Sequence, residues 1–475
     1  MMPRTLRPLT ALAAALLLAG CMVGPDYQRP TLGLPGSYAE PAPIAGQTPP
    51  AVARAWWKAF QDPMLDDLVE AALAHNADPA AAAARLEEAQ GVLREVDGVE
   101  WPEFDLTGSG SRSRASTVTA TSQASAPTVR NDFVGRIGTN FELDFWGKLR
   151  RASEAARADA LASRYGQDTV ALTLVRQVVE AYLDLRALDA QVAVTQETFA
   201  SREESQRIVS RRQTGGLASG LDLRQAEAAT EAVRAQLAEL RRQREVTEHL
   251  LGRLSGRLDL AIPAGDLRQM PNLAAVPPGL PARLLEDRPD VRQAEAALTG
   301  ANARIGVAKA ALFPSISLTG SVGTQSKDLS DWFSGPASIW NIGLALDLPI
   351  FDAGQRAARV DQATARQKAA LAGYIGAVRG AFTEVRDALS GVARQGEQES
   401  AQGRQVEAAS QAEALARRRY AEGYSAYLEV LDAQRTAQAA TLSYIASRRA
   451  RLVATVDLYA ALGGGWLTTE TTGTP

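Results

Sequence analysis

The 475-residue chain has almost no thiol or imidazole chemistry. It contains one cysteine and two histidines, His75 and His249, and its net charge at pH 7 is only −3. A lone cysteine excludes disulfides within the chain, and two histidines without a cysteine partner argue against a zinc site. The small net charge indicates no attraction to nucleic acid. We therefore expect no bound metal, no cofactor and no catalytic residue.

Long hydrophobic runs are also absent once the amino-terminal segment is set aside. Only residues 11–18 form an uninterrupted apolar stretch at that end, and none of the later stretches approaches the roughly 20 residues that a membrane helix requires. If the mature chain crosses a membrane, it must therefore do so as β-strands.

The amino-terminal segment is typical of a bacterial lipoprotein signal. Arg4 and Arg7 precede the apolar run, and residues 18–21 read Leu-Ala-Gly-Cys. We predict that residues 1–20 are a signal peptide and that Cys21 carries a covalent lipid, with residues 21–55 forming an extended, lipidated arm. Acyl chains contribute about 0.8 kcal/mol per buried methylene, so several chains anchor a protein to a membrane. The alternative is an ordinary secretory signal in which a cysteine follows glycine by chance.

The rest of the chain repeats itself. Residues 106–109, Leu-Thr-Gly-Ser, recur 212 positions later at 318–321, and further along Gly147 and Gly216 recur 207 positions later as Gly354 and Gly423. A period this long indicates a duplicated half and not a solenoid. We therefore divide the mature chain into a first repeat, 56–257, a proline-rich connector, 258–281, a second repeat, 282–462, and a carboxy-terminal tail, 463–475.

Each half contains two segments in which apolar and polar residues alternate. The predicted strands are 104–113, 132–145, 315–324 and 340–350. Each is long enough for the roughly 9 to 11 residues of a tilted membrane strand. Aromatic residues at both ends favour a membrane β-barrel over the soluble alternative, a pair of sandwich hairpins. The polar positions expected to face a barrel lumen are Arg136, Asn140, Glu142, Asp144 and Asp347.

Very long helices follow each pair of strands. We predict helices over 148–212 and 221–254 in the first half, and over 355–420 and 428–462 in the second. Ala, Arg, Glu, Gln and Leu dominate these segments and favour helix. At 1.5 Å per residue the longer ones reach roughly 100 Å, which far exceeds a globular core, so they need partners along their whole length.

Four strands per chain cannot close a barrel. A membrane barrel must remove its strand edges, and bacterial barrels have at least about eight strands. Two, three or four copies of the chain would each supply enough strands, and the residues alone do not choose among these numbers.

Several motifs resemble one known family, the outer-membrane factors of the TolC type, in particular the NodT-like lipoprotein branch that serves resistance-nodulation-division efflux pumps. The motifs that carry the resemblance lie at residues 23–30, 56–63, 288–295, 420–424 and 427–435. The resemblance implies a homotrimer whose twelve strands form one membrane barrel that continues as a helical barrel through the periplasm. It also implies passive exit of drugs or other solutes delivered by an inner-membrane pump and a periplasmic adaptor. The location implied is the outer membrane of a Gram-negative bacterium, in contact with its lipids.

Two glycine-containing turns join the long helices and are expected to contact the adaptor. The residues concerned are Gly215, Gly216, Ser219 and Gly220 in the first turn and Gly423, Tyr424, Ser425 and Tyr427 in the second. The alternative is that the glycines only supply the positive φ of a tight turn.

A gate is expected just inside the second turn. Leu428, Asp432 and Arg435 are spaced i, i+4, i+7 and therefore share a helix face. The resemblance implies that this face closes the tube in the trimer, and that the gate comprises Tyr420, Leu428, Glu429, Asp432 and Arg435. The local alternative is an Asp432–Arg435 pair worth about 0.2 to 0.5 kcal/mol, with Leu428 in a coiled-coil core.

Two alternative functions also remain open at this stage. A duct for secreted proteins would share the fold and these residues. A lipid-anchored coiled-coil scaffold without a pore would lack alternating strands.

If the barrel embeds the protein, the lipid on Cys21 is a second anchor. Met22 follows the cysteine, which by resemblance to other lipoproteins favours delivery to the outer membrane. A Cys21→Ala chain with a cleavable signal should therefore still form channels, as measured by trimers in outer-membrane fractions and by conductance in a planar bilayer. Complete loss of trimers from the outer membrane would contradict this expectation.

Overall fold

A computed structural model of the chain describes residues 22–38, 55–116, 118, 129–273 and 284–464. The predicted signal peptide, Cys21 and nearly all of the tail lie outside these residues. The chain forms two compact units. The first combines Met1–Thr31, Arg85–Ser163 and Ala294–Tyr374, and the second combines Leu32–Ala84, Arg164–Gln293 and Ile375–Pro475. Each unit thus draws on both halves of the sequence.

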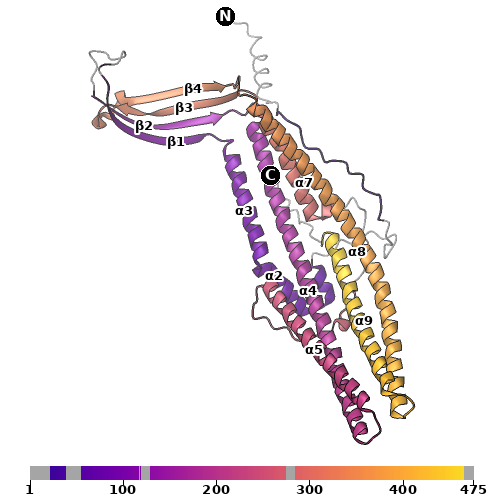
Figure 1. Cartoon of the computed structure of the whole chain (residues 1–475). Helices are drawn as coiled ribbons and strands as arrows, with labels where there is room; N and C mark the ends of the chain where they lie inside the picture. The colour runs from indigo at the N-terminus through magenta and orange to yellow at the C-terminus, as the bar shows by residue number, and fades with distance from the viewer. Residues whose placement is uncertain (1–21, 39–54, 117, 119–128, 274–283, 465–475) are drawn as a thin grey trace. The chain divides into compact units, whose positions relative to one another are not determined.

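The predicted fold class, mainly helical with four strands, is confirmed for the described residues (Figure 1). In chain order the elements are η1 (Trp56–Phe60), α2 (Pro63–His75), α3 (Ala77–Gly98), β1 (Glu103–Arg114), β2 (Val129–Glu142), α4 (Lys148–Thr214), α5 (Gly220–Ser255), η2 (Leu267–Gln269), α6 (Leu284–Asp287), α7 (Pro289–Ala310), β3 (Ser315–Ser326), η4 (Leu329–Asp331), η5 (Gly335–Ala337), β4 (Ser338–Asp347), α8 (Gln355–Ala421) and α9 (Tyr427–Ala461).

The duplication is visible in the element bounds. Strand β3 begins and ends 212 residues after β1, and α8 begins and ends 207 residues after α4. Strand β2 has 14 residues whereas β4 has 10, so much of the length difference between the halves falls in this pair of strands.

Two predicted strands extend too far at their carboxyl ends. Strand β2 stops at Glu142 and β4 stops at Asp347, so residues 143–145 and 348–350 are not strand. In the first case the Asp144 carboxylate accepts a hydrogen bond from the Arg150 backbone N–H at 3.0 Å and helps to start α4. In the second, Pro349 has no N–H to donate to a neighbouring strand. Asp144 therefore lies beyond the strand and not on its polar face.

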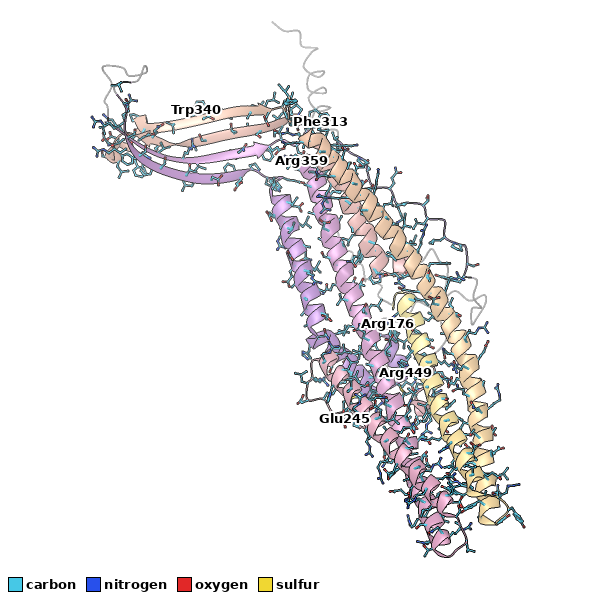
Figure 2. All side chains as sticks on the ribbon, in the orientation of Figure 1. Arg176, Glu245, Phe313, Trp340, Arg359 and Arg449 are labelled. Atoms are coloured by element: carbon cyan, nitrogen blue, oxygen red, sulfur yellow. The ribbon has the colours of Figure 1, made fainter. Side chains whose placement is uncertain are left out.

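The four strands form one antiparallel sheet in the first unit, in the order β1-β2-β3-β4 (Figure 1). Their register aligns four apolar side chains in a row across the sheet, which are Leu106, Ile137, Val322 and Trp340. All four are exposed, Leu106 to 80 %, and Figure 2 shows Trp340 on the sheet. One chain therefore leaves this apolar face uncovered.

The largest apolar core of the described residues lies in the second unit. Trp56, Trp57 and Phe60 of η1 pack with α2, α5, α9 and the apolar stripe of α4. Val178, Val179 and Leu185 of α4 are buried in this core. These large side chains each stabilise the folded state by about 1.5 to 3 kcal/mol through burial.

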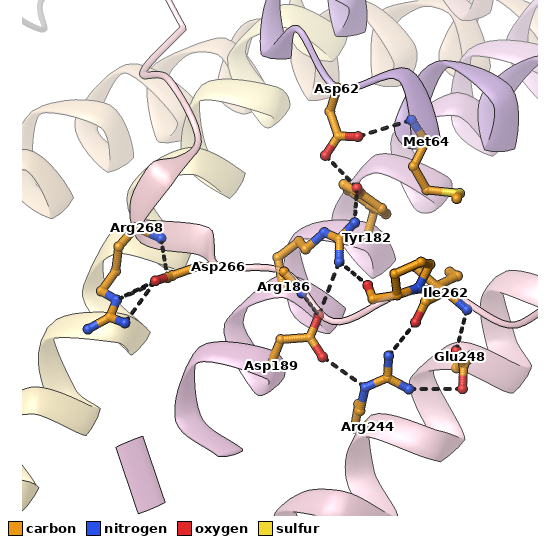
Figure 3. Close-up of polar contacts among 12 residues, drawn as sticks. Asp62, Met64, Tyr182, Arg186, Asp189, Arg244, Glu248, Ile262, Asp266 and Arg268 are labelled. Atoms are coloured by element: carbon orange, nitrogen blue, oxygen red, sulfur yellow. Dashed lines mark hydrogen bonds and ion pairs between the residues drawn. The ribbon is translucent and has the colours of Figure 1, made fainter. Parts of the chain in front are cut away.

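A buried polar cluster ties the proline-rich connector to the long helices (Figure 3). We call Arg186, Asp189 and Arg244 the connector clamp. Asp189 has a side chain only 1 % exposed and accepts hydrogen bonds from Arg186 at 3.2 Å and Arg244 at 2.8 Å. The two guanidinium groups also donate to the carbonyl oxygens of Pro263, at 2.7 Å, and Ile262, at 2.6 Å. Because each charge is paired and hydrogen-bonded, the buried cluster is tolerated.

The clamp continues to the start of α2. The Tyr182 hydroxyl donates to the carboxylate of Asp62 and accepts from Arg186 at 2.5 Å, while the same Asp62 caps α2 by accepting from the Met64 N–H at 3.0 Å. Burial raises the pKa of Tyr182, and its hydrogen bond to Asp62 adds to that shift. The hydroxyl thus stays a donor, and α2, α4 and the connector form one hydrogen-bonded group.

Asp189→Asn should destabilise the second unit strongly. The variant keeps the shape of the side chain but leaves the buried Arg186 without a counter-charge and leaves Arg244 with only Glu248, at 3.0 Å. Removing one partner of a buried ion pair costs about 3 to 5 kcal/mol. The measurement is the midpoint of thermal or denaturant unfolding of the purified protein.

Asp266→Asn provides the matched control from the same connector. The side chain of its partner Arg268 is 42 % exposed, so this pair contributes no more than about 1 kcal/mol. Equal shifts of the unfolding midpoint in the two variants would show that the connector clamp contributes no more to stability than the exposed pair does.

Candidate functional site

The helices that precede the two turns, α4 and α8, end in the same way. Gly216 and Gly423 have φ values of 74° and 83°, in the left-handed region. The next residue in each turn, Leu217 or Tyr424, donates its backbone N–H to a carbonyl five residues earlier, at 2.7 Å and 2.8 Å. This is the Schellman pattern, in which glycine relieves the steric cost of positive φ. The glycines therefore have a backbone role, whatever else the turns do.

The helices that leave the two turns begin differently. Ser219 and Asp222 form a capping box, in which the Asp222 N–H donates to the Ser219 hydroxyl at 3.1 Å and the Ser219 N–H donates to the Asp222 carboxylate at 3.0 Å. The equivalent N-cap residue of α9 is Ala426, whose side chain forms no capping hydrogen bond. A cap contributes about 1 kcal/mol, so the first turn of α9 is held less firmly than that of α5.

Most of the predicted adaptor-contacting residues lie at the surface of the turns. Gly215, Gly216, Ser219, Gly220, Gly423 and Tyr424 are exposed, and Ser425 is half-buried. Tyr427 is the exception, because it is only 3 % exposed and its ring packs 5.6 Å from that of Tyr420. Tyr427 is therefore a packing residue, and its prediction as an exposed contact was wrong.

The predicted gate residue Tyr420 lies between two neighbours at the end of α8. The guanidinium carbon of Arg212, on α4, lies 4.7 Å from the centre of the Tyr420 ring, in a cation–π contact. Tyr420 thus connects the ends of α4, α8 and α9 within one chain.

Leu428, Asp432 and Arg435 share the outer side of α9. Leu428 is 55 % exposed and the other two are exposed, whereas Val430 and Leu431 are buried on the opposite side. Leu428 is therefore not in the coiled-coil core of this chain. Within the described part of the chain, Asp432 and Arg435 form no ion pair with each other, so the local alternative for these residues is not observed.

Glu429 differs from Leu428, Asp432 and Arg435 because its side chain has a partner in its own hairpin. Its carboxylate pairs with Arg419 at 2.9 Å, and both side chains are about half exposed. An exposed pair of this kind contributes at most about 1 kcal/mol. The unpaired side of α9 consequently consists of Leu428, Asp432 and Arg435.

The predicted lumen residues lie on one face of the sheet, apart from Asp144. The register of β2, β3 and β4 places Arg136, Asn140, Glu142 and Asp347 on the face opposite the apolar row. Glu142 also pairs with Lys148 at 3.0 Å, at the start of α4. The sheet thus has one charged face and one apolar face.

The arm that follows Cys21 is docked within the first unit. The Val23 N–H donates to the Trp146 carbonyl at 3.0 Å, and Met22 packs so closely on Gly147 that a Cβ there would lie 2.6 Å from its side chain. Further along, Arg29 forms two hydrogen bonds with Glu295, at 2.6 Å and 2.8 Å. Residue 22 therefore lies where β2 leads into α4, next to the predicted lipid position.

One buried residue near the predicted gate, Arg202 of α4, was not predicted from the sequence. Long helices contain many arginines, most of which lie at the surface. The seven-residue spacing of Thr195, Arg202 and Val209 was nevertheless a signal of burial in the sequence, and all three residues are buried. A heptad position indicates packing against a neighbouring helix.

The helices join laterally through ion pairs elsewhere in the second unit. Arg176 of α4 pairs with Asp457 of α9 at 3.2 Å, and Arg449 of α9 pairs with Asp184 of α4; both arginines are labelled in Figure 2. Among the described residues there is no group of three or more His, Cys, Asp or Glu side chains placed to hold a metal ion. None of the described helices is long and apolar enough to cross a membrane.

Solved structures with the same fold are outer-membrane channels. The CmeC outer membrane channel of Campylobacter jejuni matches with a TM-score of 0.88 at 26 % identity, covering 95 % of this chain and 96 % of that chain. The MtrE outer membrane channel of Neisseria gonorrhoeae, in its open state, matches with a TM-score of 0.84 at 30 % identity, over 94 % and 98 % of the two chains.

Sequence comparison gives the same result. The cation efflux system protein CusC of Escherichia coli O6:H1 is 34 % identical over 455 residues, which are 95 % of this chain and 97 % of the relative. The probable efflux pump outer membrane protein TtgC of Pseudomonas putida is 35 % identical over 466 residues, 96 % and 95 % of the two chains. The family profile for outer membrane efflux proteins matches residues 68–257 and 280–464. The family predicted from the sequence motifs is thus confirmed: this chain belongs to the outer membrane efflux protein family.

Proposed function

We propose that three copies of this chain form the outer-membrane exit duct of a tripartite efflux system. The duct is passive, and it carries small molecules that an inner-membrane pump and a periplasmic adaptor deliver. The proposal is supported by relatives whose names are those of efflux proteins and by solved channels with the same fold.

The observation that carries the proposal is the open, four-stranded sheet with one exposed apolar face. Strands β1 and β4 are its edges among the described residues, and the apolar row across it is uncovered. In a bilayer both edges must be paired, and twelve strands from three chains would pair them. A coiled-coil scaffold, the alternative of a different class, does not account for such a sheet.

The gate is proposed for the unpaired side of α9. In a threefold arrangement Leu428 would supply an apolar ring and Asp432 an acidic ring near the axis. The uncapped start of α9 supports a movable segment, because fewer local bonds must break there than at the capped start of α5.

The partners are proposed from the efflux family. An adaptor would meet the exposed turns at Gly215, Gly220 and Tyr424, and the pump would be of the resistance-nodulation-division type. The lipid on Cys21 would anchor the docked arm to the inner leaflet of the outer membrane, where α4 begins. The named efflux relatives favour this role over a duct for secreted proteins.

Deletion of the gene tests the function. The deleted strain should become more susceptible to toxic compounds and should retain more of a fluorescent dye, and the wild-type gene should restore both. The protein should also migrate as a heat-modifiable trimer from outer-membrane fractions. Unchanged dye retention together with a monomeric, heat-insensitive protein would reject the duct.

The proposed gate predicts a wider resting pore in two variants. Asp432→Ala should remove three like charges from the aperture and Leu428→Ala should remove three bulky side chains. Each should raise the single-channel conductance of the reconstituted trimer in a planar bilayer.

The duplication supplies matched controls for this measurement. Leu221 is the first-half equivalent of Leu428 and is similarly exposed, at 67 %, and Gln225 is the equivalent of Asp432. Leu221→Ala and Gln225→Ala should leave the conductance unchanged. The gate assignment fails if the second-half variants do not change conductance, or if the controls change it equally.

A further inference from the structure

Arg202 is a buried cation without a full set of partners. Its side chain lies on α4 and is 2 % exposed, and neither Nε nor Nη1 has a hydrogen-bond partner among the described residues. A buried charge is ordinarily paired and hydrogen-bonded, because removing it from water is costly. This position therefore destabilises the packing in which it takes part.

Polar groups on the buried face of α9 also lack a full set of partners. Tyr427 lies beside Arg202. Gln434 lies seven residues after Tyr427 and so shares its face of α9; it is 4 % exposed, and neither its side-chain oxygen nor its side-chain nitrogen has a partner among the described residues. The helix that carries the proposed gate thus buries unsatisfied polar atoms.

The surrounding charges are also unbalanced. Glu413 is the carboxylate that favours charged Arg202, but it is already held by Arg417 at 2.6 Å. Arg435 is close enough to oppose the charge. Burial lowers the pKa of Arg202 most, and Arg435 lowers it further, whereas Tyr427 and Glu413 act in the other direction.

Two small apolar clusters lie along the buried face of α9. The cluster nearer the turn consists of Val209, Ala226, Ala229, Ala416, Tyr427, Val430 and Leu431, and the next one consists of Ala409, Ala437 and Ala440. Val209 is the only α4 residue in the first cluster, and the second joins α9 to α8 alone. Little buried apolar surface therefore holds the first turns of α9 to α4 beside the unsatisfied polar groups.

We infer that Arg202 is a positioning residue that biases the gate toward opening. Separation of the first turns of α9 from α4 would hydrate the guanidinium, so its buried charge raises the free energy of the closed arrangement relative to the open one. A group shifts such an equilibrium only by the difference between its interactions in the two states, and hydration of Arg202 supplies that difference. This inference rests on the proposed gate at the start of α9.

Hydrogen exchange of the purified, full-length trimer in nanodiscs tests the inference. Arg202→Met replaces the charge with an apolar chain of similar length, so the amides of residues 427–437 should exchange roughly tenfold more slowly. Arg202→Lys keeps a charge and should differ from the wild type by less than about twofold. The buried α4 amides of residues 178–187 serve as the internal reference and should not change.

Two further variants make the result decisive. Gln434→Met removes a second buried unsatisfied group, on α9 itself, and should also slow exchange at residues 427–437. When Arg202→Met is combined with Asp432→Ala, the conductance should fall below that of Asp432→Ala alone.

The inference is overturned if Arg202→Met leaves exchange unchanged, accelerates it or prevents trimer assembly, since each result would make Arg202 neutral or stabilising in the closed state. If the wild type and every gate variant fail to conduct, the proposed function fails, but the exchange rates still decide the role of Arg202.

Discussion

Two unpaired strand edges are the constraint on which this chain depends. The sheet of β1 to β4 leaves the outer backbone groups of its first and last strands without partners among the described residues, and it leaves an apolar row uncovered. A bilayer contains no water to satisfy those groups. Association of several copies answers both needs at once, and it would bring the helices that follow the strands into one tube. The proposed trimer follows from those edges, and the proposed tunnel and axial gate depend on the trimer.

Packing in the second unit differs greatly between the core around η1 and the helix turns. Large side chains and the fully paired connector clamp hold α2, α4, α5 and the connector together. Near the turns, the apolar cluster contains one α4 residue, Val209, and the buried Arg202 lacks a full set of partners. Local opening free energy follows buried apolar contact, so the start of α9 is the weaker region. A channel that opens at one end while its middle stays assembled requires this kind of gradient.

Much of the fold could be predicted because two periods dominate the sequence. Alternation identified all four strands and the long uninterrupted segments identified the helices, most of whose ends lie within two residues of prediction. The errors came from contacts that a period does not encode. Asp144 lies past the end of β2 and accepts a hydrogen bond from the Arg150 N–H in the first turn of α4, and Pro349 lies past the end of β4. At the candidate site, spacing grouped Leu428, Asp432 and Arg435 correctly, yet it could not place Tyr427 inside the hairpin.

The sequence by itself determined the duplicated order of strands and helices and the family, because periodic spacing identifies the elements and contiguous motifs identify the family. Tertiary structure alone decided which charges are buried. Arg186 and Arg244 find Asp189 through a connector distant in sequence, whereas Arg202 finds no such carboxylate. All three are arginines in helical segments of similar composition. Their difference depends on what the neighbouring helices place opposite them, since the energy of a charge is set by its surroundings.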